Sequence, residues 1–202
     1  MIKKVINIII FSPFLLIKKV KWLYYSLTFG EFGKGSTIEG KVYFISPSNI
    51  FIGKNSSIGP YCRIETFSNY GKQLTEPKLI IGDNCSLQHA VHIYCAGKVE
   101  IKKGCLIASG CMITDENHGM DPQKGYYASQ PLLIKPTVLE EGVWLGENVC
   151  VLSGVTIGQY SVIGANSVVK SNIPDYSIAA GNPARVVKQY NFETKNWERT
   201  NV

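Results

Sequence analysis

Residues 139–169 read LEEGVWLGENVCVLSGVTIGQYSVIGANSVV, and this stretch repeats with a period of six. Every sixth residue is aliphatic, in a run made of Leu139, Leu145, Val151, Ile157, Ile163 and Val169. A period of six matches neither the 3.6-residue turn of an α-helix nor the two-residue alternation of a long strand. It fits short strands joined by tight corners, and three such strands predict one coil of a triangular prism.

The same period continues upstream and defines the body of the chain. Further anchors come in groups of three: Phe32, Ile38, Phe44; Ile52, Ile58, Ile64; Ile81, Leu87, Ile93; and Ile101, Ile107, Ile113. Self-similarity at a fixed period is the signature of a solenoid. We therefore expect a mainly β protein, a parallel β-helix of about six triangular coils over residues 31–188.

The repeat is interrupted four times, always after the third anchor of a coil. The breaks fall between Phe44 and Ile52, Ile64 and Ile81, Ile93 and Ile101, and Ile113 and Leu139. All four insertions should therefore leave one edge of the prism and stack above one another, as insertions do on the binding face of a solenoid. The longest insertion, residues 114–138, contains His118.

Four of the six cysteines share one repeat position, four residues after an anchor: Cys62, Cys85, Cys105 and Cys111. Serine and valine fill that position in other coils, which indicates a narrow interior site. A thiol there acts as a small apolar side chain. We expect free buried thiols in a cytosolic protein, rather than the disulfides of a small secreted domain.

The charge is concentrated at one end of the chain. The 202 residues carry 21 Lys and Arg against 15 Asp and Glu, a net charge of +6. Residues 1–30 contain five Lys and no acid, so the remainder is nearly neutral, with 16 basic against 15 acidic residues. A nucleic-acid groove needs clustered cations along the body, and this distribution argues against nucleic acid as a partner.

Residues 1–30 form a segment of their own, and residues 189–202 form a C-terminal tail. The apolar run over residues 5–17 is shorter than the roughly 20 residues of a membrane span, and lysines stand where a signal-peptide cleavage site would be. On a helical wheel most of the lysines share one arc, which predicts an amphipathic helix. Two interpretations stay open: the helix lies on a membrane surface, or it covers the core or another subunit.

The motifs GVWLG (142–146), GVTIG (154–158), SVIGA (161–165) and AAGNPARV (179–186) carry a family resemblance. The chain resembles the hexapeptide-repeat acyltransferases, which have a left-handed parallel β-helix. It looks most like the branch of maltose and galactoside O-acetyltransferases and their relatives that acetylate capsular or lipopolysaccharide sugars. The resemblance implies a cytoplasmic enzyme, a homotrimer with three donor sites each drawing on two chains, acetyl-CoA as co-substrate, a sugar acceptor and no metal.

In that family a histidine on the long insertion is the general base, and His118 stands in the matching place. A sugar hydroxyl is a poor nucleophile, so a neutral imidazole within hydrogen-bond reach suits the reaction. Asp115, Glu116, Asp121 or a backbone carbonyl would hold the other ring nitrogen. Gln88 stands where these enzymes carry an Asn near the reacting groups, so the resemblance implies a contact with the acceptor or the oxyanion.

The resemblance also implies a set of donor-binding residues: Trp144, Gly146, Ala165, Lys170, Ser171, Arg185 and Lys188. Trp144 and Gly146 would border the thioester, with Trp144 also beside the acceptor. Lys170 and Ser171 would follow along the groove, while Arg185 and Lys188 would face the nucleotide phosphates, which suits fixed positive charge. Aromatic residues of the insertions, including Tyr70, are suited to stacking on sugars.

Two other classes of function compete with this interpretation. The γ-type carbonic anhydrases share the architecture and bind zinc through three histidines, and this chain has three. However, His89 and His92 lie three residues apart, which on a regular strand turns them to opposite faces, and His118 lies in a long insertion. The third class is a non-catalytic scaffold docked on a membrane or partner by residues 1–30. Metal analysis tests the carbonic anhydrase interpretation, and thioester turnover tests the scaffold interpretation.

Overall fold

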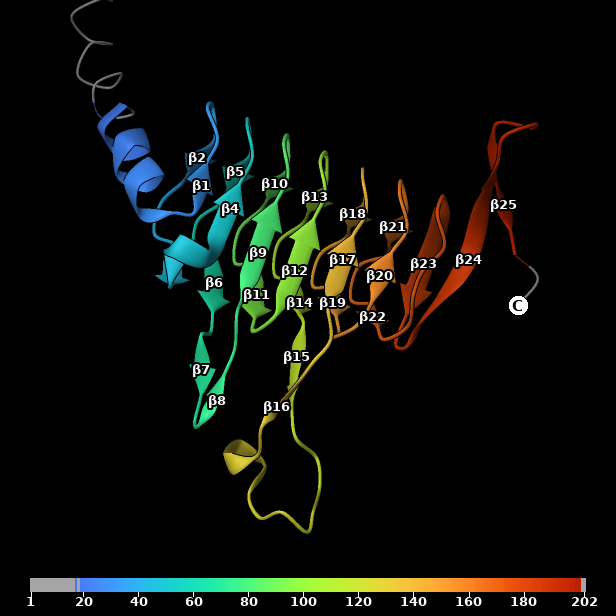
Figure 1. The fold of residues 1–202 in the computed structure, drawn as a ribbon. Helices are drawn as coiled ribbons and strands as arrows, with labels where there is room; N and C mark the ends of the chain where they lie inside the picture. The colour runs from blue at the N-terminus through green and yellow to red at the C-terminus, as the bar shows by residue number, and fades with distance from the viewer. Residues whose placement is uncertain (1–16, 18, 201–202) are drawn as a thin grey trace, which may run out of the picture.

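The computed structural model describes residue 17 and residues 19–200, which form three parallel sheets around one core (Figure 1). Sheet A contains β1 (Glu31–Phe32), β4 (Ile50–Ile52), β9 (Lys78–Ile81), β12 (Lys98–Ile101), β17 (Thr137–Leu139) and β20 (Thr156–Ile157). Sheet B contains β2 (Thr37–Ile38), β5 (Ser57–Ile58), β10 (Ser86–Leu87), β13 (Leu106–Ile107), β18 (Trp144–Leu145), β21 (Val162–Ile163), β23 (Ser177–Gly181), β24 (Ala184–Asn191) and β25 (Asn196–Arg199). Sheet C contains β3 (Tyr43–Ile45), β6 (Arg63–Thr66), β11 (His92–Cys95), β14 (Met112–Thr114), β19 (Cys150–Val151) and β22 (Val168–Val169).

The chain visits sheets A, B and C in turn, so each circuit makes one triangular coil, and six strands of each sheet complete six coils. Anchors of successive coils pair in register, as Ile52 does with Ile81 in sheet A and Ile64 with Ile93 in sheet C. These side chains are at most 1% exposed. The expected triangular β-helix is confirmed, because the period of six places one anchor on each wall.

The thiols at the narrow interior position also make hydrogen bonds between neighbouring coils. The thiol of Cys62 donates to the carbonyl of Gln88, and that of Cys105 to the carbonyl of Glu140, each at 3.1 Å and each to the next coil. The four cysteines at this position are free and buried, as the repeat predicts; Cys95 and Cys150, outside it, are also free. Burial raises the pKa of the Cys111 thiol to about 11, which keeps it protonated and available as a donor.

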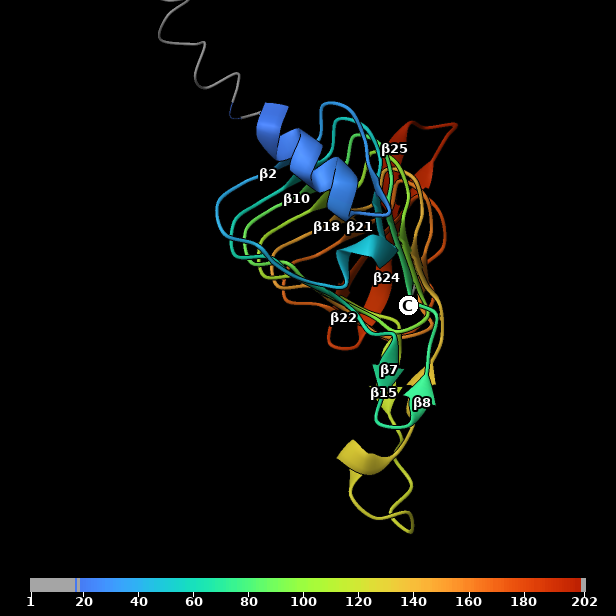
Figure 2. The ribbon, with the colours of Figure 1, turned by 60° about the vertical axis from the view of Figure 1, so that its left-hand side comes forward.

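The four insertions all leave the edge where sheet C turns toward sheet A, called here the C–A edge, as predicted. They contain η1 (Pro47–Asn49), the hairpin of β7 (Asn69–Tyr70) and β8 (Gln73–Leu74), a turn at residues 96–97, and a loop with β15 (Glu116–His118), η2 (Tyr127–Ser129) and β16 (Leu132–Ile134). We call residues 69–74 the first hairpin and residues 115–136 the His118 loop. Both project from the prism on the same side (Figures 1 and 2).

A helix over residues 19–28 lies at the N-terminal end of the prism (Figure 2). The rings of Tyr25 and Phe29 pack against Phe32 at 5.2 and 5.7 Å, and Phe29 also meets Phe44 at 5.0 Å. The helix therefore covers the open end of the core, as one of the two interpretations predicts. The expectations for residues 1–16 lie outside the described residues. Within the described part, no helix is long and apolar enough to cross a membrane.

Candidate active site

His118 ends β15, and its ring meets a tyrosine from a different insertion. Tyr70 of β7 places its Oη 3.1 Å from Nδ1 of His118 and donates to the backbone carbonyl of Ala128 at 2.7 Å. Because a phenol has one proton, Tyr70 must accept from Nδ1–H of His118, and in the neutral form of the ring this fixes the tautomer. The lone pair of the exposed imidazole then lies on Nε2. This is the tautomer that a general base acting through Nε2 requires.

Polar contacts hold the first hairpin and the His118 loop side by side. The side-chain amide of Gln73 makes two hydrogen bonds to the backbone of Leu132. Its Oε1 accepts from the N–H at 2.6 Å, and its Nε2 donates to the carbonyl at 3.2 Å. Within the loop, the buried amide of Gln130 accepts from the backbone N–H of Asp121 at 3.1 Å and donates to its carbonyl at 2.7 Å. The position of His118 is therefore determined by two insertions together.

Two of the three carboxylates expected to orient His118 have other partners. Asp115 is fully buried and accepts from the backbone N–H groups of Ala96 at 2.8 Å and Gly97 at 2.7 Å, so it anchors the base of the loop. Asp121 pairs with Lys124 at 3.2 Å. The structure thus differs from the sequence-based expectation, which gave Tyr70 only a role in stacking on sugars. No local sequence signal links Tyr70 to a histidine 48 residues later.

Glu116 lies two residues before His118 and therefore on the same face of β15. Its Oε2 atom is buried and has no hydrogen-bond partner among the described residues. Burial raises the pKa of Glu116, and a positive charge on His118 opposes that rise. An ionised Glu116 would accordingly stabilise the imidazolium that forms when His118 accepts a proton.

Several predicted residues stack along the edge where sheet B turns toward sheet C, called here the B–C edge. Gln88 and Gly146 are corner residues on this edge, and exposed Ala165 is in the coil directly after Gly146. A Cβ at Gly146 would lie 2.7 Å from the backbone nitrogen of Ala165, so close coil stacking alone accounts for this glycine. Arg185 of β24 continues the row, paired with Ala180.

The remaining predicted residues lie on other parts of the prism. Trp144 is on the outer face of β18, 48% exposed, and Lys188 of β24 pairs with Ile178 in sheet B. Lys170 and Ser171 follow the last strand of sheet C and therefore lie at the C–A edge, as His118 does. The width of sheet C separates these residues from the B–C edge. One chain therefore does not gather the whole predicted set at a single place.

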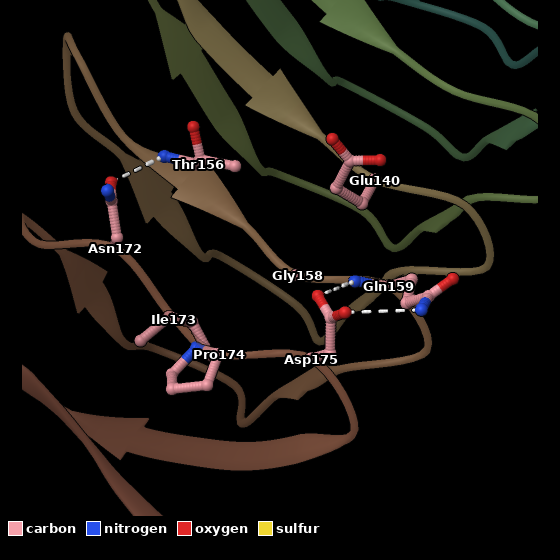
Figure 3. Close-up of a pocket in the computed structure, with 8 residues that line it drawn as sticks. All are labelled: Glu140, Thr156, Gly158, Gln159, Asn172, Ile173, Pro174 and Asp175. Atoms are coloured by element: carbon pink, nitrogen blue, oxygen red, sulfur yellow. Dashed lines mark hydrogen bonds between the residues drawn. The ribbon is translucent and has the colours of Figure 1, made fainter.

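A cleft at the third edge, where sheet A turns toward sheet B, has a structural explanation (Figure 3). Asp175 accepts from the backbone N–H of Gln159 at 3.0 Å and from its side-chain amide at 3.1 Å. Asn172 accepts from the backbone N–H of Thr156 at 2.8 Å. These contacts attach the last coil to the preceding one, and the residues drawn in Figure 3 include no predicted site residue.

The three histidines lie on three different elements. His89 is a corner residue rather than part of a strand, and its ring meets Tyr61 edge-on at 5.6 Å. His92 points outward from β11, and His118 is on the loop. Over residues 19–200 there is no group of three or more His, Cys, Asp or Glu side chains that could hold a metal ion.

Comparisons with known proteins support the repeat and the fold. The profile of the bacterial transferase hexapeptide family (six repeats) matches residues 136–171. WbbJ of Escherichia coli (strain K12), assigned to lipopolysaccharide biosynthesis as an O-acetyl transferase, is 37% identical over 164 residues, covering 78% of this chain and 80% of WbbJ. Galactoside O-acetyltransferase of the same strain is 28% identical over 170 residues, covering 84% and 68% of the two chains.

A solved structure extends the agreement to three dimensions. The maltose O-acetyltransferase from Clostridium difficile 630 is 30% identical, with a TM-score of 0.54, and the match covers 82% of this chain and 72% of that one. The periodic anchors, the triangular coils and these relatives lead to the same conclusion. The chain belongs to the hexapeptide-repeat acetyltransferases, a family of acetyl-CoA-dependent enzymes.

Proposed function

We propose that the protein transfers an acetyl group from acetyl-CoA to a sugar hydroxyl during synthesis of lipopolysaccharide or another surface polysaccharide. The observation that carries the proposal is the contact of Tyr70 with His118, which leaves Nε2 as an exposed base. The names of the relatives, an O-acetyl transferase of lipopolysaccharide biosynthesis and a galactoside O-acetyltransferase, support a sugar hydroxyl as the acceptor.

The proposed chemistry uses one proton relay. Nε2 of His118 accepts the hydroxyl proton as the sugar oxygen attacks the thioester carbonyl. The C–O bond of the ester forms, the C–S bond breaks, and the imidazolium returns the proton to the departing CoA thiolate. The half-buried Glu116 would stabilise the transient imidazolium, while Tyr70 keeps Nδ1 protonated throughout.

A screen of acceptors tests the proposal. The full chain is incubated with acetyl-CoA and nucleotide-linked, lipid-linked or free glycans, and free CoA is measured. We expect CoA release that depends on a glycan acceptor. Release at equal rates with and without every glycan would contradict the proposed function.

We infer that the active unit is a homotrimer in the cytoplasm. The His118 loop and Lys170 lie at the C–A edge, whereas Gly146, Ala165 and Arg185 line the B–C edge. A ring of three chains with threefold symmetry would bring the first edge of each chain against the second edge of its neighbour. Each donor site would then combine the base and Lys170 of one chain with the small residues and Arg185 of the next.

Replacing Tyr70 with phenylalanine should lower kcat about tenfold, because it removes only part of the 10²–10⁴ that a general base supplies. The ring loses the acceptor for Nδ1–H, so the tautomer protonated on Nε2 becomes populated. Nitrogen NMR of the imidazole measures that population. Tyr126→Phe, in the His118 loop and 88% exposed, is the matched control and should leave both readouts unchanged. Wild-type kcat and tautomer ratio in Tyr70→Phe would contradict the role of Tyr70.

The N-terminal helix supports a peripheral location at the membrane surface. Its exposed side chains Val20, Leu23, Tyr24 and Leu27 have the spacing of one helix face. Leu23 and Leu27 of this stripe lie on the side of the helix away from Tyr25, which packs on the prism, whereas Tyr24 is at the border and contacts the Tyr25 ring at 5.5 Å. Residues 1–30 contain five Lys and no acid, which suits anionic lipid. We infer that one face of the helix closes the prism and the other rests on lipid.

The double variant Leu23→Gln and Leu27→Gln tests this location without disturbing Tyr25. Sedimentation with anionic liposomes should show binding weakened about tenfold or more, because each buried leucine contributes roughly 1.5–3 kcal/mol. Transfer to a small soluble sugar should be unchanged. Leu74→Gln, on the first hairpin and 85% exposed, is the control. Unchanged sedimentation, or loss of the trimer in the double variant, would contradict lipid as the partner.

A further inference from the structure

A row of outward-facing side chains crosses sheet C at its N-terminal end, apart from the His118 loop. Tyr43, Arg63 and His92 are direct neighbours on β3, β6 and β11. The guanidinium carbon of Arg63 lies 6.0 Å from the ring centre of Tyr43 and 5.6 Å from that of Tyr94, within the range of cation–π attraction. Two aromatic rings therefore hold this cation in place.

A buried carboxylate completes the support of Arg63. Glu65, whose side chain is 2% exposed, accepts from Nε of Arg63 at 2.5 Å. A buried carboxylate is stable only with such a partner, so the pair fixes the guanidinium. Within the part of the chain that the structure describes, no hydrogen bond uses the Nη groups of Arg63, and its side chain is 51% exposed. A fixed guanidinium with free Nη groups is prepared to bind a carboxylate or phosphate through two hydrogen bonds.

Arg63 is part of the wall of a cleft between the N-terminal helix and sheet C. Its described lining includes Lys41, Tyr43, Tyr61, Arg63 and His92. Tyr43 and Tyr61 are 57% and 64% exposed, and tyrosine rings offer apolar faces on which sugar rings stack. The lining has two permanent cations and no carboxylate. Arg63 is paired with Glu65 through Nε only, so its free Nη groups and the ammonium of Lys41, combined with the aromatic faces, favour a sugar that carries negative charge.

The cleft and the proposed base lie at opposite ends of the same sheet. From Arg63 the chain runs along β6 into the first hairpin, where Tyr70 contacts His118. The four residues of β6 alone cover about 10 Å, which is longer than one sugar ring, and the first hairpin then projects further from the prism (Figure 1). A single acceptor that occupies both places is therefore an oligosaccharide.

We propose that this cleft is an acceptor subsite for an anionic sugar within an oligosaccharide, one or more rings away from the hydroxyl that is acetylated. Arg63 binds the carboxylate or phosphate of that sugar, and Tyr43 and Tyr61 stack on its ring. The inference rests on the proposed function, because it names the class of acceptor for the same reaction.

Isothermal titration calorimetry on the full chain tests the subsite without requiring turnover. The probes are a tetrasaccharide that contains glucuronate, a neutral tetrasaccharide of N-acetylglucosamine, and glucose 1-phosphate. We expect at least one anionic probe to bind about tenfold more tightly than the neutral probe, a preference that Arg63→Gln abolishes. The two anionic probes distinguish a carboxylate from a phosphate. Equal affinities for all three probes would overturn the proposal.

Matched variants separate binding from folding. The control is Lys98→Gln on β12 of sheet A. Lys98 pairs with Glu100 at 2.8 Å, two residues later along the strand as Glu65 is from Arg63. This variant should keep the preference for anionic probes. Arg63→Lys keeps the positive charge but cannot form a bidentate contact, so it should retain only part of the preference for anionic probes. Tyr43→Leu leaves Glu65 paired and should weaken all sugar probes. An unchanged preference in Arg63→Gln, or a trimer lost in that variant, would overturn the subsite.

The outcomes for the subsite and for the proposed function can be told apart. His118→Ala should bind the anionic probe as the wild type does, because His118 is outside the cleft lining. Probe binding in a protein that acetylates no glycan would retain the subsite and refute the proposed function. Glycan acetylation without any preference for anionic probes would support the proposed function and refute the subsite.

Discussion

Replacing His118 with alanine is expected to lower kcat for acetyl transfer by about 10²–10⁴, the range that a general base supplies. Nε2 is the atom proposed to accept the hydroxyl proton, and the contact of Tyr70 with Nδ1 leaves the lone pair of the neutral imidazole on Nε2. Steady-state release of CoA in the presence of a glycan acceptor measures the effect.

Acetyl-CoA affinity should be nearly unchanged in the same variant, because the loss falls on the chemical step rather than on ground-state binding. Lys124→Ala is the control in the same loop, since it removes only the exposed ion pair with Asp121, and solvent screening makes such pairs weak. Near-normal kcat in His118→Ala would refute the assignment of the base.

Mixed trimers should recover activity that each parent variant lacks. His118→Ala removes the base, and Ala165→Trp fills the B–C edge at an exposed position without entering the core. If each site pairs the loop of one chain with the B–C edge of the next, random mixing leaves about a quarter of the sites intact. Co-expressed variants should therefore reach about a quarter of wild-type activity.

Light scattering on the parents and the mixture checks that all three are trimers. A site formed within one chain would give a different result, because every chain in the mixture would carry a defect in its own site. Absence of any recovery in a mixed trimer would contradict the intersubunit site, as would a stable, active monomer.

The coils and their insertions could be predicted because one period determines both. Each anchor, such as Ile64 or Ile93, marks a wall of the prism, so any excess spacing marks an insertion and the edge from which it leaves. The same counting places Lys170 directly after the third anchor of its coil and Gly146 after the second. Their separation on two edges thus follows from the repeat, although the family resemblance treats them as one groove.

Contacts between insertions could not be predicted in this way. The partner of His118 is Tyr70. The two residues meet because the first hairpin follows β6 and the His118 loop follows β14, so both leave the same edge with only β11 between those strands. Asp115, a nearer acidic residue, turns inward to bind the backbone of Ala96 and Gly97. The hydrogen bonds of the interior thiols were also missed, because residue size alone suggests a small apolar side chain.

The N-terminal helix shows why two interpretations of one segment remained open. A helix has several faces, and its sequence shows that apolar residues are present without showing what each face contacts. The structure assigns Tyr25 and Phe29 to the core, while Leu23 and Leu27 are exposed.

The most direct test of the central claim is the chemical nature of the product. Acetyl-CoA labelled in the acetyl group is incubated with the enzyme and a glycan acceptor, and the labelled glycan is examined by mass spectrometry and NMR. We predict one acetyl group bound to a sugar oxygen as an ester that mild alkali removes, and no labelled glycan with His118→Ala. Label in an alkali-stable amide, or a wild-type enzyme that binds acetyl-CoA and transfers nothing to any glycan, would contradict the account.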